Sequence, residues 1–333
     1  MRIAVVGLGA MGGYIAARML AAGLAPAALV TPRHLAPLAE RGLELRAAEG
    51  SGRWPIRASA RAAELGVQDV LVLALKATAL PAIAPTLAPL IGPRTLIVAA
   101  MNGVPWWFFH GLDAGLAARP LAAVDPGGVV GAALPPAQTI GCVLHLAASQ
   151  PAPGVVEHAF GNRFLIGDPL ARGAAGSARD RAPPLIALFA GAGMEAAAVD
   201  DIQAEVWYKL WGNMTTNPIS AMTGATMDRI FADPDVRAFM RRVMVEAGEV
   251  SRRFGITVPG TPEERFALGE QLGAFRTSML QDVDGNRPIE LDGLLGTVIE
   301  IADRLGVAVP DIRTLMGLTR LRAQTLGLYP AAG

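Results

Sequence analysis

The chain has 333 residues, of which 52% are hydrophobic and 17% are charged, and its 29 basic residues balance its 29 acidic ones. This composition favours a cytoplasmic globular protein with a large core, and it gives no electrostatic reason to expect nucleic acid or a membrane as a partner. The single cysteine, Cys142, excludes an internal disulfide framework, and the four histidines lack the spacing of metal ligands. We therefore predict no metal site.

The first residues show the pattern of a dinucleotide-binding turn. A β-branched run, "RIAVV", is followed by "GLGAMG" at 7–12 and then by a helical pattern. In such a turn Gly7 permits a tight bend, Gly9 lets a pyrophosphate approach the backbone, and Gly12 lets helix and strand pack closely. A tight βα turn without a ligand is the alternative. The residues that we predict to bind the phosphates are Gly7, Leu8, Gly9, Ala10, Met11 and Gly12.

More strands are predicted at residues 27–31, 43–47, 68–75 and 94–100, and they alternate with helical segments. This alternation is typical of an open parallel sheet, in which ligands lie beyond the carboxyl ends of the strands. Lys76 and Asn102 directly follow two of these strand ends. Lys76 is one of only two lysines beside 27 arginines, which favours a site residue over a solvated loop cation. Asn102 is either a site residue or part of a turn with Gly103.

The segment after the second strand indicates the form of the dinucleotide. A site for NAD usually places an acid on the ribose about twenty residues past the glycines. Residues 27–38 contain no acid, and their polar candidates are Arg33 and His34. A cation here favours a 2′-phosphate, so we predict NADPH bound by Arg33, with NADH as the alternative.

From about residue 201 onward the pattern is almost wholly helical, and "TPEE" at 261–264 is a helix-capping signature. We therefore predict two domains in an α/β protein. Residues 1–200 form a dinucleotide-binding domain with a Rossmann-type parallel sheet, and residues 201–333 form an all-helical domain that carries substrate-binding and catalytic groups.

The stretch "WYKLWGNMTTNPIS" at 207–220 contains the second lysine. On a helix, Lys209, Asn213, Asn217 and Ser220 fall within an arc of about 80°, opposite the two tryptophans. Unlike arginine, a lysine can lower its pKa and pass a proton. Uncharged amides beside it suit a cleft that binds a polar ligand, and a structural polar seam is the alternative. Later in the chain, Ser278 and Glu290 form a second polar cluster, although Glu290 is equally explained as an acid in the first turn of a helix.

Six pieces of the sequence, taken together in this order and spacing, resemble the ketopantoate reductase (2-dehydropantoate 2-reductase) family. They are "GLGAMG", "ALKAT", "MNGV", "PAPGVVEH", "WYKLWGNMTTNPISAMTG" and "SMLQDVDGNRPIELDGLLG". The resemblance implies an N-terminal Rossmann domain, a C-terminal helical domain like that of 6-phosphogluconate dehydrogenase, and an active site in the cleft between them. It also implies reduction of a 2-oxo acid with NADPH.

The resemblance assigns roles by position. Lys209 matches the general acid, and Glu290 matches the glutamate that pairs with the lysine and a substrate hydroxyl. Lys76 matches the lysine near the nicotinamide, and Ser278 the serine that binds the substrate carboxylate. The amides that would hold the substrate are Asn102, Asn213 and Asn217.

We therefore predict that the chain reduces 2-dehydropantoate to pantoate, in pantothenate and coenzyme A biosynthesis. The partner is a small-molecule 2-oxo acid, and a homodimer is an open option for the assembly. Three alternatives remain: a reductase for a bulkier 2-oxo acid, a β-hydroxyacid dehydrogenase, and a non-catalytic NADPH sensor. The aromatic run from Trp106 to Phe109 bears on the first, because we expect some of these side chains to pack outside the core, either joining the two domains or lining an apolar pocket.

Overall fold

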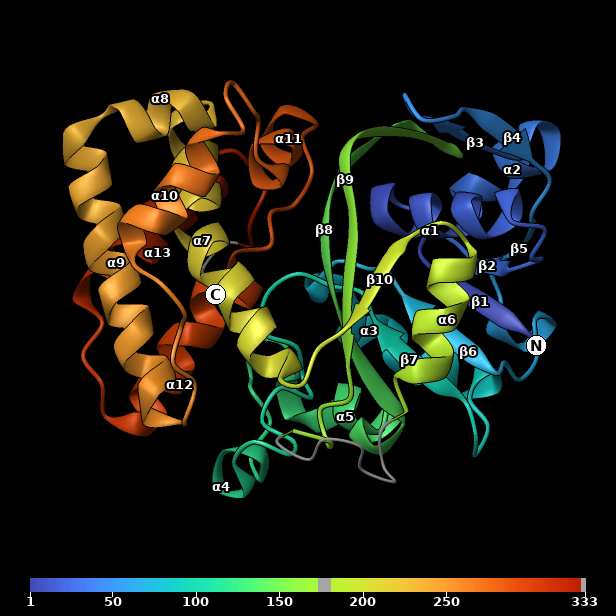
Figure 1. Cartoon of the computed structure of the whole chain (residues 1–333), viewed down its shortest axis with the longest axis horizontal. Coiled ribbons are helices and arrows are strands. Elements are labelled where there is room, and N and C mark those ends of the chain that lie inside the picture. The colour runs from blue at the N-terminus through green and yellow to red at the C-terminus, as the bar shows by residue number, and fades with distance from the viewer. Residues whose placement is uncertain (173–180, 331–333) are drawn as a thin grey trace. The chain divides into compact units, whose positions relative to one another are not determined.

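The computed structural model describes residues 1–172 and 181–330 (Figure 1), and it forms two compact units. The first unit contains Met1–Met101, Pro105–Pro120 and Asp125–Ile202. The second contains Gln203–Gly333 together with two short segments from the first half of the chain, Asn102–Val104 and Leu121–Val124. The predicted fold class, α/β followed by a helical half, is confirmed, and Asn102 belongs to the helical unit.

A mixed ten-stranded sheet forms the centre of the first unit, with the order β4-β3-β9-β8-β7-β6-β1-β2-β5 and β10 paired to β9. The path from β5 through β2, β1, β6 and β7 to β8 is parallel, whereas β8 pairs antiparallel with β9, and β3 with β4. The strands are β1 (Ile3–Val6), β2 (Ala27–Leu29), β3 (Leu43–Arg46), β4 (Gly52–Trp54), β5 (Arg57–Ser59), β6 (Val70–Leu73), β7 (Leu96–Ala99), β8 (Thr139–Ala152), β9 (Val155–Gly167) and β10 (Glu195–Ala198).

Apolar strand residues and helix α1 make the core of this unit. Strands β1, "IAVV", and β6, "VLVL", are buried at every position, as expected for parallel strands covered on both faces. Helix α1 packs against β3, β8 and β9. The α-helices of this unit are α1 (Ala10–Ala21), α2 (Leu35–Arg41), α3 (Leu80–Ile83), α4 (Ala114–Ala117), α5 (Val129–Ala133) and α6 (Pro183–Gly191).

The long β8–β9 hairpin, drawn in green in Figure 1, was not predicted from the sequence. Its turn residue Gly154 has a φ of +79°, a conformation that favours glycine. Register shifts between His145 and Ala152 interrupt the pairing. The predicted purely parallel sheet is therefore extended by antiparallel pairs on the β8 side.

The aromatic run lies in the interior of the first unit. The side chains of Trp106, Trp107, Phe108 and Phe109 are between 0% and 7% exposed. The Trp106 indole N–H donates to the carbonyl oxygen of Leu134 at 3.0 Å, and the ring of Trp107 lies against Gly141. Both tryptophans thus contact other residues of the first unit, and the glycine of β8 leaves room for the second indole.

The second unit is helical (Figure 1), and the side chains of Asp233, Thr261 and Thr277 cap three of its described helices. The Thr261 hydroxyl accepts from the Glu264 N–H while the Glu264 carboxylate accepts from the Thr261 N–H, which is the predicted capping box. Asp233 caps α9 by accepting from two backbone N–H groups. Among the described residues, no helix is both long enough and apolar enough to cross a bilayer. The helices are α7 (Ile202–Thr223), α8 (Met227–Ala232), α9 (Pro234–Arg253), α10 (Pro262–Glu270), α11 (Ser278–Asp284), α12 (Thr297–Leu305) and α13 (Pro310–Thr325).

Candidate active site

The glycine turn between β1 and α1 has the geometry of a phosphate cradle. Gly7 has a φ of +88°, and a Cβ on Gly12 would lie 1.9 Å from the Gly7 carbonyl oxygen, so both positions require glycine. Gly9 differs, because a Cβ there would meet nothing within 4 Å. It caps the N-terminus of α1 in an extended conformation, without a side-chain cap. The turn therefore keeps open space over the backbone at the position where a pyrophosphate would approach, and the residues fit a dinucleotide.

The end of β2 presents one exposed cation. Arg33 is exposed, whereas His34 is buried with its Nδ1 atom 2.8 Å from the Thr31 hydroxyl. Burial lowers the pKa of His34, and the nearby charge of Arg33 lowers it further. The imidazole is therefore an inward-facing neutral group, and Arg33 is the residue of this pair that can meet a phosphate. Lys76 is half-buried where β6 ends, as the sequence predicted.

In the second unit, Lys209 of α7 contacts Asn102. The lysine ammonium group donates a hydrogen bond to the side-chain oxygen of Asn102 at 2.8 Å, across 107 residues of sequence. The segment that carries Asn102 is fixed by its neighbours. The Val104 N–H donates to the Gly293 carbonyl oxygen at 3.1 Å, and a Cβ on Gly103 would lie 2.4 Å from the same oxygen. Backbone contacts thus hold Asn102 beside α7.

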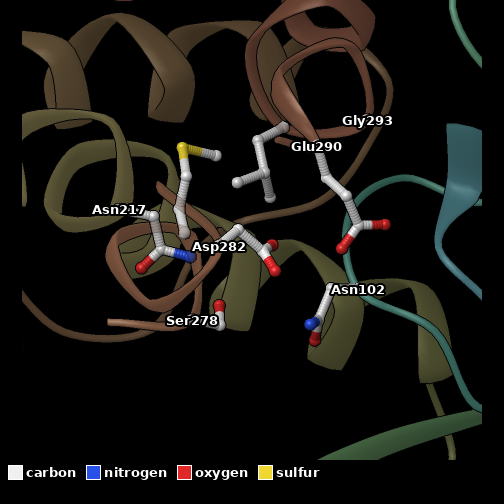
Figure 2. Close-up of a pocket in the computed structure, with 8 residues that line it drawn as sticks. Asn102, Asn217, Ser278, Asp282, Glu290 and Gly293 are labelled. Atoms are coloured by element: carbon white, nitrogen blue, oxygen red, sulfur yellow. The ribbon is translucent and has the colours of Figure 1, made fainter. Parts of the chain in front are cut away.

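A pocket in the second unit gathers four of the predicted site residues (Figure 2). Asn217 reaches it from α7, Ser278 from α11, and Asn102 and Glu290 from segments between regular elements. The carboxylate of Glu290 points toward Asn102 in this view. The full lining is Asn102, Asn217, Ser278, Met279, Asp282, Glu290, Gly293 and Leu294. It offers donors from amides and a hydroxyl beside two carboxylates.

Other predicted residues lie outside this lining. Lys209 is connected to the pocket through its hydrogen bond with Asn102, and Asn213 lies half-buried one turn further along α7. Ser220, on the same stripe, donates its hydroxyl to the Ala225 carbonyl oxygen. The residues of this helix face therefore differ in role. Lys209, at its beginning, contacts a residue of the pocket, whereas Ser220, at its end, bonds to the backbone that follows the helix. The predicted cofactor residues, apart from Asn102, all belong to the first unit.

The pocket also contains residues that were not predicted, namely Met279, Asp282, Gly293 and Leu294. Asp282 is the ionisable residue among these four, and its buried carboxylate lines the pocket. The sequence carried a signal for it: Asp282 lies four residues after Ser278, and residues at this spacing share one face of a helix. Gly293 and Leu294 lie in a π-helical turn, Asp292–Gly296, which the sequence pattern did not indicate.

Comparison with known proteins identifies the family. Residues 3–170 match the family described as "Ketopantoate reductase PanE/ApbA", and residues 201–323 match its C-terminal domain, "Ketopantoate reductase PanE/ApbA C terminal". The chain belongs to the ketopantoate reductase family. A curated relative from Mesorhizobium japonicum, named 2-dehydropantoate 2-reductase, is 39% identical to this reductase over 330 residues, which are 99% of this chain and 100% of that protein. The reductase is thus an oxidoreductase, as predicted.

Solved structures agree with this assignment. A candidate ketopantoate reductase from Ralstonia solanacearum MolK2 is 45% identical, with a TM-score of 0.92, and the match covers 98% of this chain and 99% of that chain. A D-mandelate dehydrogenase solved with NADH and anilino(oxo)acetate has a TM-score of 0.83 at 19% identity, with 98% and 100% covered. At that identity the second likeness shows the common fold alone.

Proposed function

We propose that this reductase converts 2-dehydropantoate to pantoate with NADPH, in the cytoplasm, as a step of pantothenate biosynthesis. The observation that supports the proposal most is the pocket of the helical unit, where Asn102, Asn217, Ser278 and Glu290 come together. Lys209 is hydrogen-bonded to the first of these residues. These are the residue types that binding and protonating a small 2-oxo acid requires, and the full-length relative with this activity is 39% identical.

We assign cofactor binding to the first unit. The open space over Gly9 and the free N–H groups at the start of α1 suit a pyrophosphate. Arg33 would pair with the 2′-phosphate, because a guanidinium group can donate two parallel hydrogen bonds to a phosphate. Lys76 would contact the cofactor near its nicotinamide end. A bound reduced nicotinamide supplies the hydride.

We assign Lys209 as the general acid. It donates a proton to the keto oxygen of the substrate as negative charge develops there, a role that typically contributes about 10²- to 10⁴-fold to the rate. An ammonium group has three N–H donors and no acceptor. One donor is directed to the Asn102 side-chain oxygen at 2.8 Å, which holds the lysine beside a residue of the pocket lining.

The remaining groups position the substrate. The Ser278 hydroxyl and the amide group of Asn217 can donate to a carboxylate, and Asn213 would support Lys209 from the next turn of α7. Glu290 is an acceptor, and we assign it to the hydroxyl group that forms at C2. This arrangement puts donors on the carboxylate and acceptors on the hydroxyl, which matches a 2-hydroxy acid product.

The test is a spectrophotometric assay of reduced-nicotinamide oxidation with a panel of 2-oxo acids, each with NADPH and with NADH. We expect the highest kcat/KM for 2-dehydropantoate with NADPH. A higher value for a bulkier 2-oxo acid would overturn the substrate assignment. Cofactor binding without turnover of any 2-oxo acid would instead point to a sensor.

A further inference from the structure

Two neighbouring residues near the end of the chain hold the segment that carries Glu290. This segment follows α11, and Glu290 itself lies outside regular structure. The Ile289 N–H, directly before it, donates to the Leu328 carbonyl oxygen at 3.2 Å. The Tyr329 hydroxyl donates to the carboxylate of Asp292, two residues after Glu290, at 2.6 Å. The segment of the pocket acid is therefore fixed on both sides by adjacent residues of the C-terminal segment.

The hydrogen bond between Tyr329 and Asp292 is well supported by its surroundings. The Tyr329 side chain is half-buried, and burial raises the pKa of its phenol, while the hydrogen bond to Asp292 and the charge of that residue raise it further. The phenol therefore stays a donor over the ordinary pH range of an enzyme assay. Gly296 leaves room for the acceptor, because a Cβ there would lie 3.3 Å from the Asp292 Oδ1 atom. A hydrogen bond to a charged acceptor is roughly twice as strong as one between neutral groups.

A π-helical turn connects this hydrogen bond to a second residue of the site. Asp292 is the first residue of the turn Asp292–Gly296, and turns of this kind occur frequently at functional sites. The next residue, Gly293, lines the pocket, and its carbonyl oxygen accepts from the Val104 N–H at 3.1 Å. That bond holds the segment of Asn102. The position of the turn therefore affects both the pocket acid and the pocket amide.

Neither Tyr329 nor Asp292 belongs to the pocket lining. An effect of these two residues on catalysis would therefore run through the residues that do line the pocket. Reacting groups have to be held close to their productive geometry, and a displacement of about 1 Å can lower a rate by about 10²-fold. A hydrogen bond that fixes the backbone on which an acid is carried can thus influence the rate without contact with the substrate.

We propose that Tyr329 is a positioning residue of the active site. Its hydrogen bond to Asp292 fixes the segment of Glu290, so that this carboxylate meets the hydroxyl group that forms at C2 of the substrate. The inference rests on the proposed function and adds to it a residue from the opposite end of the chain to the cofactor turn. It requires the hydroxyl group of the tyrosine, since the ring alone makes no hydrogen bond to the carboxylate.

The experiment removes the hydrogen bond from each side. kcat and KM for 2-dehydropantoate and the Kd of NADPH are measured for the wild-type protein, Tyr329→Phe, Asp292→Ala and Asp292→Asn. We expect Tyr329→Phe and Asp292→Ala to lower kcat/KM by about 10- to 100-fold. The Kd of NADPH should change little, because the cofactor residues of the glycine turn belong to the first unit. Asp292→Asn should keep most of the activity, because an amide oxygen still accepts from the phenol.

Two further measurements distinguish positioning from a general loss of stability. Thr319→Val is the matched control, because it removes a buried hydroxyl group that donates to the Leu315 carbonyl oxygen at 2.8 Å within α13. It should lower the thermal stability and leave kcat/KM as in the wild type. Tyr329→Phe is also combined with Glu290→Ala. If the tyrosine acts through this acid, its further effect on kcat/KM should be much smaller in the double variant, whereas independent effects multiply.

The outcomes separate two failures. If the wild-type protein does not reduce 2-dehydropantoate, the proposed function fails, and the inference is overturned with it. If it does, the inference alone is overturned when Tyr329→Phe keeps the wild-type kcat/KM or lowers it by the same factor with and without Glu290. Thermal unfolding of each variant identifies loss of fold. Should Tyr329→Phe not fold, Asp292→Ala and Asp292→Asn decide, because equal activities of these two variants would contradict a role for the hydrogen bond.

Discussion

The glycine turn makes a prediction that separates ligand binding from folding. Gly9→Ala and Gly12→Ala each add one methyl group to the same turn, three residues apart. At Gly9 the new Cβ meets nothing within 4 Å, and the residue has φ −71° and ψ −163°, which alanine adopts without strain. At Gly12 the new Cβ would lie 1.9 Å from the Gly7 carbonyl oxygen and 3.0 Å from the Cβ of Ala74. The two substitutions should therefore have opposite effects.

The magnitudes follow from these distances. Gly9→Ala should raise the stability of the cofactor-free protein by about 0.4–1 kcal/mol, because alanine restricts the unfolded chain. Its methyl group occupies the space over the backbone, so NADPH should lose at least one charge-assisted hydrogen bond, about 1.5–3 kcal/mol, or roughly a 10- to 150-fold weaker Kd. Gly12→Ala overpacks helix against strand and should cost about 1–3 kcal/mol or more even without cofactor.

The assays are thermal unfolding of the cofactor-free proteins and titration of NADPH followed by fluorescence. Gly191→Ala is the matched control, because a Cβ there also meets nothing within 4 Å and the residue lies at the end of α6, outside the glycine turn. It should gain a little stability and keep wild-type affinity. Unchanged NADPH affinity in Gly9→Ala would refute the reasoning that the pyrophosphate approaches the backbone at this position.

Three further predictions concern other parts of the molecule. Lys209→Ala should lower kcat by about 10²- to 10⁴-fold with little change in cofactor affinity, and Lys209→Arg should restore little activity; steady-state kinetics with near wild-type turnover would remove the lysine from its role. Arg33→Ala should weaken NADPH by about 1.5–3 kcal/mol and spare NADH, so equal losses in the two titrations would place 2′-phosphate recognition elsewhere. Trp107→Ala should cost about 3–5 kcal/mol in denaturant unfolding, because the side chain is fully buried, and should leave the ranking of 2-oxo acids as it is; a reordered ranking would contradict its purely structural role.

Local patterns predicted the early strands and the lysine helix well, because those signals are contained in short windows. Gly7 and Gly12 have specific steric reasons, and Lys209 lies on a helix as its spacing indicated. The β8–β9 hairpin was missed because β-branched residues occupy only short pieces of its two strands, such as Val155 and Val156 at the start of β9. Its stability comes from pairing, including a parallel neighbour, β3, about a hundred residues earlier, which no local pattern contains.

The sequence could not predict that Asn102 belongs to the helical unit, for the same reason. The residue follows β7, so the strand pattern places it with the parallel sheet. Its backbone segment is instead fixed by the Gly293 carbonyl oxygen, 190 residues later, through the Val104 N–H and the close approach of Gly103. Only the folded chain shows that the φ of +80° at Gly103 serves this contact with the helical unit. The bond between Lys209 and Asn102 depends on that contact.

Asp282 is different, because the information needed to find it was local and was not used. The stretch "SMLQDVDG" contains two acids, and on a helix Asp282 lies about 40° from Ser278, whereas Asp284 lies about 120° from Ser278. Once Ser278 is a predicted site residue, helical spacing alone selects the first acid and rejects the second. The arginines that pair with them do not help, since both acids have one. What the sequence does not contain is the burial that separates the two pairs: the Asp282 side chain is 12% exposed and lines the pocket, whereas the Asp284 side chain is 44% exposed and does not.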